Sequence, residues 1–308
     1  MSRTEQPKGP SGGQGPSGPR QSGGQGPSGP RQSGGQGPSG PRQSGGHGPV
    51  VRVRMTVAYD GAPFHGFAEN EGIVTVGATL RQAIERVLGH SVTLGVAGRT
   101  DRGVHAWGQV VTFDADPARL EIDVLQRAVN ALCRPSIAVR DVAIAAEADF
   151  HARFSATARV YRYRVYNDVP PNPFVANTSW HVPQPIDLAA LRNASIPFVG
   201  THDFSSFCKR PRVLKPDAPE PSFVRAVRRA EWTRGSSANG EGDGMLVFEI
   251  EAKSFCRQMV RSIVGTLVDV GLGRRRASEI PAMLVARDRN AAGSVAPPRG
   301  LVLWLVRF

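Results

Sequence analysis

The order of secondary structure over residues 51–144 constrains the fold more than any other feature of this chain. Apolar and polar residues alternate from Val51 to Tyr59, which indicates a strand. An apolar stripe at helical spacing follows over residues 80–88, and Gly89 is a typical helix end. Further strands are expected over residues 92–96, 107–113 and 137–144. With a second helix before the last strand, the order strand-helix-strand-strand-helix-strand predicts a ferredoxin-like α+β half.

The second helix of this half is expected to begin in a capping box. Asp123 and Gln126 have the spacing of that motif. Leu125, Val129 and Leu132 then follow at helical spacing, so we expect these three side chains to face the core.

A second set of patterns follows residue 150. Strands are expected over residues 160–166, 225–232 and 245–251, and a last strand runs to Phe308. Helical spacing occurs over residues 186–199 and again from Phe255, where Arg257 and Arg261 would share one face of a helix. We therefore divide the body of the chain into an N-terminal subdomain, 50–149, and a C-terminal subdomain, 150–308.

Residues 1–49 differ from this body in composition. The eleven residues SGGQGPSGPRQ occur three times in succession over positions 11–43, and SGGHGP follows. No apolar side chain larger than proline occurs in the repeats, so burial cannot offset the entropy lost on ordering. The sequence predicts a disordered low-complexity tail over residues 1–49.

The net charge favours a polyanionic partner. The chain of 308 residues carries +12 at neutral pH, and residues 1–50 contribute five cations and one anion to it. The remaining +8 lies on the body, as expected for a protein that binds nucleic acid.

Composition also restricts the compartment and the chemistry. No apolar run reaches about 18 residues, and no apolar segment of a secretory signal occurs near Met1, so neither a membrane span nor secretion is expected. The three cysteines are far apart and lack metal-ligand spacing. We therefore expect a reduced, cytoplasmic protein with no structural metal.

The stretch from Gly98 to His105 contains the strongest candidate for catalysis. If it is extended, Arg99 and Asp101 project to the same face, because side chains alternate along a strand. The arginines beside Asp101 favour its ionised form, and a carboxylate beside phosphate-binding cations suits a nucleophile that acts on a nucleotide. The alternative is a surface turn with an ordinary ion pair between Asp101 and an arginine.

Tyrosines and arginines interleave in the strand expected over residues 160–166. Tyr161 and Tyr163 would lie on one face, with Arg162 and Arg164 on the other. Such a surface can stack on bases and pair with phosphates, although tyrosines in the core and arginines in solvent would produce the same pattern. His105 and His151 lack the partners of a metal site, and we expect hydrogen-bonding or structural roles for both.

Several of these stretches resemble the tRNA pseudouridine synthase A family. Residues 97–106, AGRTDRGVHA, are similar to its signature AGRTDxGVHA. The other similar segments are residues 150–163, 201–207, 254–265 and 296–301. The chain departs from the family pattern in having Phe67 where tryptophan is usual and Gly77 where glutamine is common.

The resemblance implies a fold, an activity and an assembly. The pseudouridine synthase fold has two similar ferredoxin-like halves that form one large antiparallel sheet with a central cleft. The implied activity is isomerisation of uridine to pseudouridine at positions 38, 39 and 40 of the tRNA anticodon stem-loop. Members of the family act as homodimers and use no cofactor.

The resemblance also implies roles for individual residues. Asp101 would be the nucleophile or base, Tyr161 would pack on the uracil and remove the proton from C5, and Arg261 would pair with Asp101. Arg99 would hold the flipped nucleotide or its phosphate. RNA contacts are further implied for the loop of Phe150, His151, Ala152, Arg153 and Phe154.

Three other functions fit parts of the sequence. A synthase of the same fold with broader RNA targets differs only in loops whose specificity cannot be derived, among them the loop expected over residues 208–222. A non-catalytic RNA-binding protein is disfavoured because Asp101, Tyr161 and Arg261 occur together. A glycoside hydrolase is disfavoured because no second acid lies in a motif.

Overall fold

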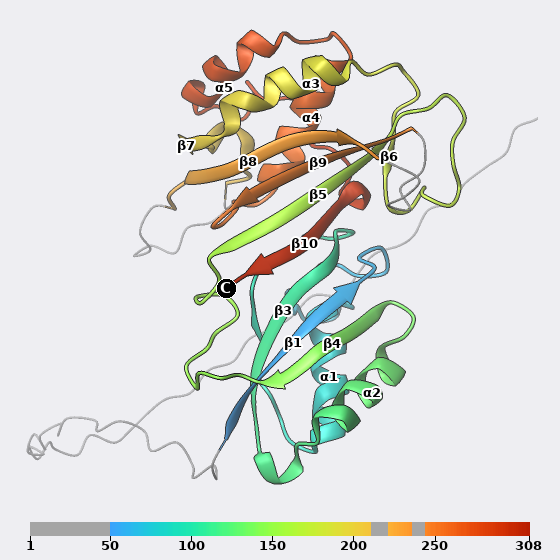
Figure 1. Ribbon diagram of the computed structural model, residues 1–308, viewed down its shortest axis with the longest axis vertical. Coiled ribbons are helices and arrows are strands. Elements are labelled where there is room, and N and C mark those ends of the chain that lie inside the picture. The colour runs from blue at the N-terminus through green and yellow to red at the C-terminus, as the bar shows by residue number, and fades with distance from the viewer. Residues whose placement is uncertain (1–49, 211–220, 236–243) are drawn as a thin grey trace, which may run out of the picture. The chain divides into compact units, whose positions relative to one another are not determined.

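A computed structural model describes residues 50–210, 221–235 and 244–308 (Figure 1). The tail predicted over residues 1–49 lies outside these ranges, as does most of the loop expected over residues 208–222.

The N-terminal half has the expected order of elements. The strands are β1 (Val51–Tyr59), β2 (Gly95–Val96), β3 (His105–Ala115) and β4 (Ile137–Ile144), with helices α1 (Val76–Leu88) and α2 (Ile122–Cys133) between them. The strand order β4-β1-β3, with β2 also paired to β3, is that of a ferredoxin-like half. Only β2 is much shorter than predicted.

The predicted end of α1 is confirmed, whereas the predicted start of α2 is wrong. In α1, the Thr75 side chain accepts from the amide of Ala78, and Gly89 adopts the left-handed conformation that ends the helix. In α2, Glu121 precedes the helix without a side-chain cap, so the predicted capping box is wrong. The helix begins early enough that Asp123 lies within its first turn.

The apolar stripe of α2 is also shifted from the prediction. Leu132 is 43% exposed, and the inward position belongs to Cys133, which is 5% exposed. Leu125, Val129 and Cys133 are spaced by four residues and therefore lie on one side of the helix.

The C-terminal half contains six further strands and three α-helices in the described residues. The strands are β5 (Ala158–Tyr166), β6 (Trp180–His181), β7 (Gly200–Asp203), β8 (Val224–Arg234), β9 (Met245–Ala252) and β10 (Leu301–Arg307). The helices are α3 (Leu188–Ser195), α4 (Met259–Gly271) and α5 (Ile280–Ala286). Because α4 begins at Met259, Arg257 precedes it, and the predicted helical face shared by Arg257 and Arg261 is wrong.

The last strand joins the two halves into one sheet. The order is β4-β1-β3-β10-β5-β9-β8-β7, so β10 from the end of the chain lies between β3 and β5. The sheet is antiparallel except where β10 pairs with β3 and β6 pairs with β5. It is therefore mixed, and the expectation of a wholly antiparallel sheet is corrected at these two pairings.

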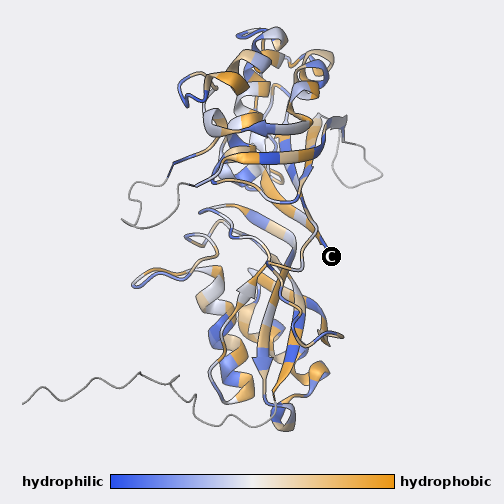
Figure 2. Ribbon diagram, turned by 90° about the vertical axis from the view of Figure 1, so that its left-hand side faces the viewer, coloured by the Kyte–Doolittle hydropathy of each residue, from blue (hydrophilic) through white to orange (hydrophobic). Residues whose placement is uncertain are grey.

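One apolar core runs through both halves. Polar and apolar residues alternate along the strands, as Figure 2 shows by hydropathy. Val53 and Val57 of β1 are fully buried in one half, as are Tyr163 and Val165 of β5 in the other. This continuous core fixes the strand ends and loops that surround the cavity described below.

Two features that would indicate other classes of protein are absent from the described residues. None of the helices in the ranges that the structure describes is both long and apolar enough to cross a membrane. Within the same ranges, no group of three or more histidine, cysteine, aspartate or glutamate side chains is placed to hold a metal ion.

Candidate active site

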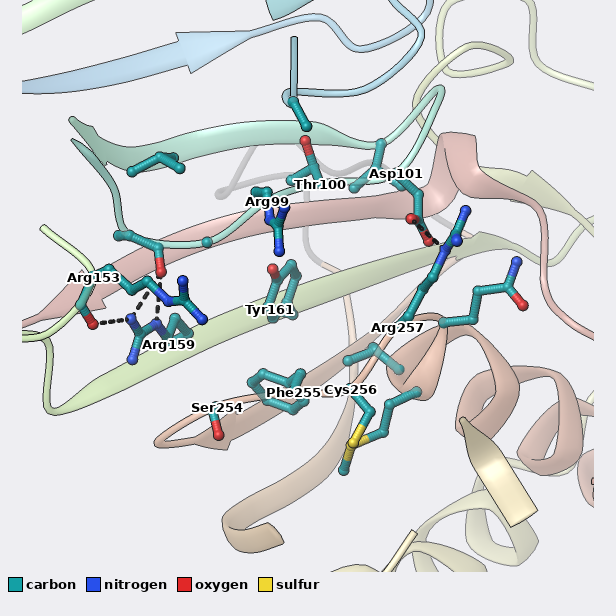
Figure 3. A pocket seen from close by; sticks show the side chains of 18 of the residues that line it. Arg99, Thr100, Asp101, Arg153, Arg159, Tyr161, Ser254, Phe255, Cys256 and Arg257 are labelled. Atoms are coloured by element: carbon teal, nitrogen blue, oxygen red, sulfur yellow. Dashed lines mark hydrogen bonds and ion pairs between the residues drawn. The ribbon is translucent and has the colours of Figure 1, made fainter. Parts of the chain in front are cut away.

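A cavity of about 1130 Å³ opens between the 98–105 loop, β5 and the segment before α4 (Figure 3). Asp101 is the one acidic residue among the described residues that line it. The lining includes seven arginines, which are Arg99, Arg102, Arg153, Arg159, Arg225, Arg257 and Arg261. The cavity therefore suits a polyanionic ligand and presents a single carboxylate to it.

The 98–105 loop points alternate side chains in opposite directions. Thr100 is 7% exposed, and its hydroxyl lies 2.8 Å from the hydroxyl of Tyr59 in the core. Arg99 and Asp101, on either side of it, line the cavity. The predicted alternation is therefore confirmed, and the buried Thr100 anchor explains why both charged side chains face the ligand space.

Gln109 of β3 holds the beginning of this loop. Its side chain is fully buried, and its Nε2 donates to the carbonyl of Gly98 at 2.5 Å while its Oε1 accepts from the amide of Gly98 at 3.3 Å. Gln109 is not among the residues predicted for the site. The signal that could have found it is a polar side chain on the core face of an otherwise apolar strand.

Asp101 forms its ion pair with Arg257. The Arg257 Nε lies 3.6 Å from the Asp101 Oδ1, as Figure 3 shows. Arg261, the expected partner, instead donates from Nε to the carbonyl of Ala296 at 2.7 Å. Burial lowers the pKa of Arg261, and the nearby Asp101 and Tyr163 oppose that shift, so Arg261 lies within electrostatic reach of the carboxylate.

Tyr161 of β5 lines the same cavity as Asp101. Its side chain is 9% exposed. The Tyr161 and Phe255 rings pack edge to face, with 5.1 Å between their centroids. Burial raises the pKa of Tyr161 well above its usual range, and Tyr59 and Asp101 raise it further. The phenol therefore carries its proton near neutral pH, and it must lose that proton before it can act as a base.

The loop over residues 150–154 divides into exposed and buried members. His151, Arg153 and Phe154 line the cavity. Phe150 and Ala152 are 9% and 0% exposed and do not line the cavity. RNA contact by this loop stays a prediction, and His151, Arg153 and Phe154 are its members that face the cavity.

The cavity-lining members of this loop contact one another, with the His151 and Phe154 rings tilted by 41°. The His151 and Phe154 rings lie 4.6 Å apart, and the guanidinium of Arg153 is 5.5 Å from the Phe154 ring centre. Phe154 is 74% exposed. An exposed ring beside a cation can stack on a nucleobase while the cation pairs with phosphate.

Arg159 ties three walls of the cavity together and was also missed as a site residue. Its guanidinium donates to the carbonyls of Ala97, Arg153, Ala156 and Lys253 at 2.6–3.4 Å. The side chain is 8% exposed, and burial lowers its pKa. A buried arginine bonded to four carbonyls fixes the positions of these segments because its five donors have a rigid geometry.

Comparison with known proteins supplies the family. A sequence profile described as tRNA pseudouridine synthase matches residues 55–155 and 194–308. The chain belongs to the tRNA pseudouridine synthase family.

Individual members of the family align over nearly their whole length. The protein called tRNA pseudouridine synthase A from Pseudothermotoga lettingae is 38% identical over 259 residues, which is 83% of this chain and 99% of that protein. Proteins of the same name from a Geobacillus strain and from Bacillus velezensis are 38% and 39% identical. These alignments cover 83% and 84% of this chain and 98% and 99% of the two proteins. With the mixed sheet and its helices, they confirm the α+β pseudouridine synthase fold.

The two departures from the family pattern meet in the structure. The amide of Gly77 donates to the carbonyl of Phe67 at 2.9 Å, and a Cβ at position 77 would lie 2.5 Å from that oxygen. Phe67 is buried, and its amide donates to the carbonyl of Thr100. In this synthase, Gly77 therefore permits the close approach through which Phe67 supports the 98–105 loop.

His105, which follows the loop, belongs to its framework. The side chain is 5% exposed, and its Nδ1 accepts from the amide of Gly61 at 3.1 Å. Gly61 in turn has no space for a side chain, because a Cβ there would lie 2.1 Å from the carbonyl oxygen of Val104. These contacts agree with the structural role predicted for His105.

Proposed function

We propose that this protein isomerises uridine to pseudouridine in tRNA, at positions 38, 39 and 40 of the anticodon stem-loop. The observation that carries the proposal is Asp101, the one carboxylate among the described lining residues of an arginine-lined cavity, beside the buried ring of Tyr161. The names of the aligned relatives support the substrate class. Uridine and pseudouridine are isomers, so the reaction consumes no cosubstrate and requires no oxidant or reductant.

Asp101 begins the reaction in this proposal. The uridine leaves its stack and enters the cavity, because its glycosidic bond cannot be reached within the helix. The Asp101 carboxylate then starts cleavage of the N1–C1′ bond, either by attack on C1′ or by removal of the C2′ proton. The released uracil turns, and its C5 forms the new bond to C1′.

Tyr161 serves the second half of the reaction. Its ring packs on the detached uracil, and Phe255 keeps that ring in place from the other side. The C5 proton must then leave, and the Tyr161 oxygen is our candidate to accept it. Because the pKa of Tyr161 is raised, its phenolate is scarce near neutral pH but strongly basic when it forms.

The arginines hold the RNA and the carboxylate. Arg99 and Arg153 are placed to pair with phosphates on either side of the flipped nucleotide, and Phe154 is placed to stack on a neighbouring base. Arg257 pairs with Asp101 in the absence of RNA. Arg261 supports the same carboxylate electrostatically from a fixed position on α4.

We also propose a homodimer in the cytoplasm, where tRNA is modified. Trp107 is 52% exposed, and its ring stacks on Trp304 at 6.1 Å, with Arg140 over one ring and Arg162 over the other. Arg162 alternates with Tyr161 along β5, so this surface lies on the sheet face opposite the cavity. Trp304 is partly buried, and an exposed tryptophan such as Trp107 beside arginines is typical of interfaces. Trp107→Ser should shift sedimentation equilibrium from dimer to monomer.

Conversion of labelled tRNA tests the function. Purified protein is incubated with tRNA that carries tritium at C5 of uridine, and tritium release is followed while pseudouridine is mapped by position. Release confined to positions 38, 39 and 40 supports the proposal, and release at other RNA positions favours the broader synthase. Tight tRNA binding without release would overturn the proposed catalysis and favour a binding protein.

A further inference from the structure

Two cysteines lie near each other at the base of the cavity, and the proposed reaction uses neither of them. Cys208 follows the short 3-10 helix Ser205–Phe207, and Cys256 lies in the segment between β9 and α4. They are 48 positions apart in the sequence, and both are free thiols. Cys208 belongs to the apolar core, Cys256 packs against the same core, and each thiol shifts the pKa of the other.

The surrounding backbone holds the two thiols together. The amide of Lys209 donates to the carbonyl of Arg257 at 2.9 Å, so the residues that follow the two cysteines are joined directly. Cys208 is 1% exposed and belongs to the apolar core, whereas Cys256 is half-buried and lines the cavity (Figure 3). A small solute in the cavity can therefore reach Cys256 first and Cys208 only through it.

Cys256 is the more nucleophilic member of the pair because it faces the cavity, whereas Cys208 lies in the core. The neighbouring Cys208 lowers the pKa of the Cys256 thiol, and Arg225, which also lines the cavity, lowers it further. The same contact and burial raise the pKa of Cys208. Cys256 therefore has the greater thiolate fraction, and Cys208 stays protonated until a leaving group appears beside it.

We propose that Cys256 is a peroxide-reactive modification site, that Cys208 resolves it to a disulfide, and that this disulfide reversibly lowers catalytic turnover. The Cys256 thiolate attacks one oxygen of hydrogen peroxide, the O–O bond breaks, and hydroxide leaves and takes up a proton as water. The Cys256 sulfenic acid is then attacked by the Cys208 sulfur, which loses its proton. The S–S bond forms as the S–O bond breaks, and a second water leaves.

The consequence for turnover follows from the neighbours of Cys256, and this part rests on the proposed function. Closing a covalent bond draws the partly buried Cys256 toward Cys208, which is fixed in the core. Phe255, on one side, packs on Tyr161, and Arg257, on the other, pairs with Asp101. The disulfide should therefore displace contacts of both catalytic groups, and a shift of about 1 Å can lower a rate by about 10²-fold.

Peptide mapping tests the chemistry without reference to activity. Reduced full-length protein is treated with hydrogen peroxide, its remaining thiols are alkylated, and its peptides are analysed by mass spectrometry. A cross-link between Cys208 and Cys256 is expected in the wild type and in the control Cys133→Ala, whose cysteine lies on α2. In Cys208→Ser, the cross-link should be absent, and dimedone should trap Cys256 as its sulfenic acid.

Turnover measured on the same samples tests the regulation. Tritium release should fall about tenfold or more on oxidation of the wild type and return after dithiothreitol. An oxidised wild type that contains no 208–256 cross-link would overturn the proposal, and a complete cross-link with unchanged turnover would overturn its regulatory part. If the reduced protein releases no tritium, the proposed function fails, and the cross-link alone decides whether the thiol pair reacts as proposed.

Discussion

Arg257 lies across the cavity from Asp101, with 3.6 Å between Nε and Oδ1, although the two residues are 156 positions apart. The Arg257 side chain is 62% exposed and can move when RNA enters. Arg261, four residues farther along and within α4, is partly buried and bonded to the carbonyl of Ala296. The two arginines near the carboxylate therefore differ in mobility, and the difference predicts different effects of mutation.

Arg257→Met should lower turnover and leave the free energy of unfolding unchanged within error, because exposed ion pairs contribute little to stability. Arg261→Met should lower turnover and also lower the free energy of unfolding by about 1–3 kcal/mol, because it leaves the carbonyl of Ala296 without this donor. Urea unfolding and single-turnover tritium release separate the two effects. Equal destabilisation by both variants would contradict the distinction.

Arg159→Lys should destabilise the protein despite conserving charge. One ammonium group cannot reproduce the contacts of the Arg159 guanidinium with four carbonyls, and we expect a loss of about 2–4 kcal/mol. Arg54→Lys, at an exposed position on β1, is the matched control and should be nearly neutral. If the two substitutions have the same effect in urea unfolding, Arg159 does not tie the cavity walls together.

Tyr161→Phe should retain tRNA affinity and lose about 10²–10⁴-fold in single-turnover rate, because the ring remains but no oxygen can take up the C5 proton. The contact with Phe255 does not involve the hydroxyl, so folding should be unaffected. Affinity is measured by filter binding beside the rate. A variant with near-normal turnover would restrict Tyr161 to packing.

The pH dependence of the wild type tests the same step. The pKa of Tyr161 is raised by burial, so the phenol is protonated at neutral pH and its phenolate fraction increases with pH. If C5 deprotonation limits the rate, turnover should rise about tenfold per pH unit from about pH 7 to 9, with no plateau in that range. Tyr161→Phe should lack this rise. Identical pH profiles for the two proteins would argue that another group takes the proton.

Local patterns predicted much of this structure correctly. The alternation in β1 and β5 and the glycine that ends α1 identified those elements because burial of one face imposes the period. Asp101 and Tyr161 were singled out by local patterns and given roles by resemblance, and the structure places both at one cavity. Neither finding required knowledge of how distant segments meet.

Features that depend on distant contacts were predicted less well. The parallel pairing of β10 with β3 depends on a strand that returns from the end of the chain, so no local pattern records it. The partner of Asp101 was misassigned because α4 begins at Met259, which frees Arg257 from the helix. Gln109 and Arg159 were missed because their importance lies in carbonyls contributed by other elements.

Asp101→Asn is the most direct test of the proposed catalysis. The substitution preserves the shape of the side chain but removes the anion, and binding should survive because the arginines of the cavity remain. Asp123→Asn, at an exposed position on α2, serves as the control and should behave as wild type. Both proteins are first shown to bind tRNA and to unfold as the wild type does.

The deciding measurement is single-turnover release of tritium from C5-labelled uridine in tRNA, with saturating Asp101→Asn protein. We predict a rate at least about 10³-fold below wild type, equivalent to about 4 kcal/mol of barrier, with tRNA affinity within about threefold. A rate within about tenfold of wild type would contradict the assignment of Asp101 as the group that begins the reaction.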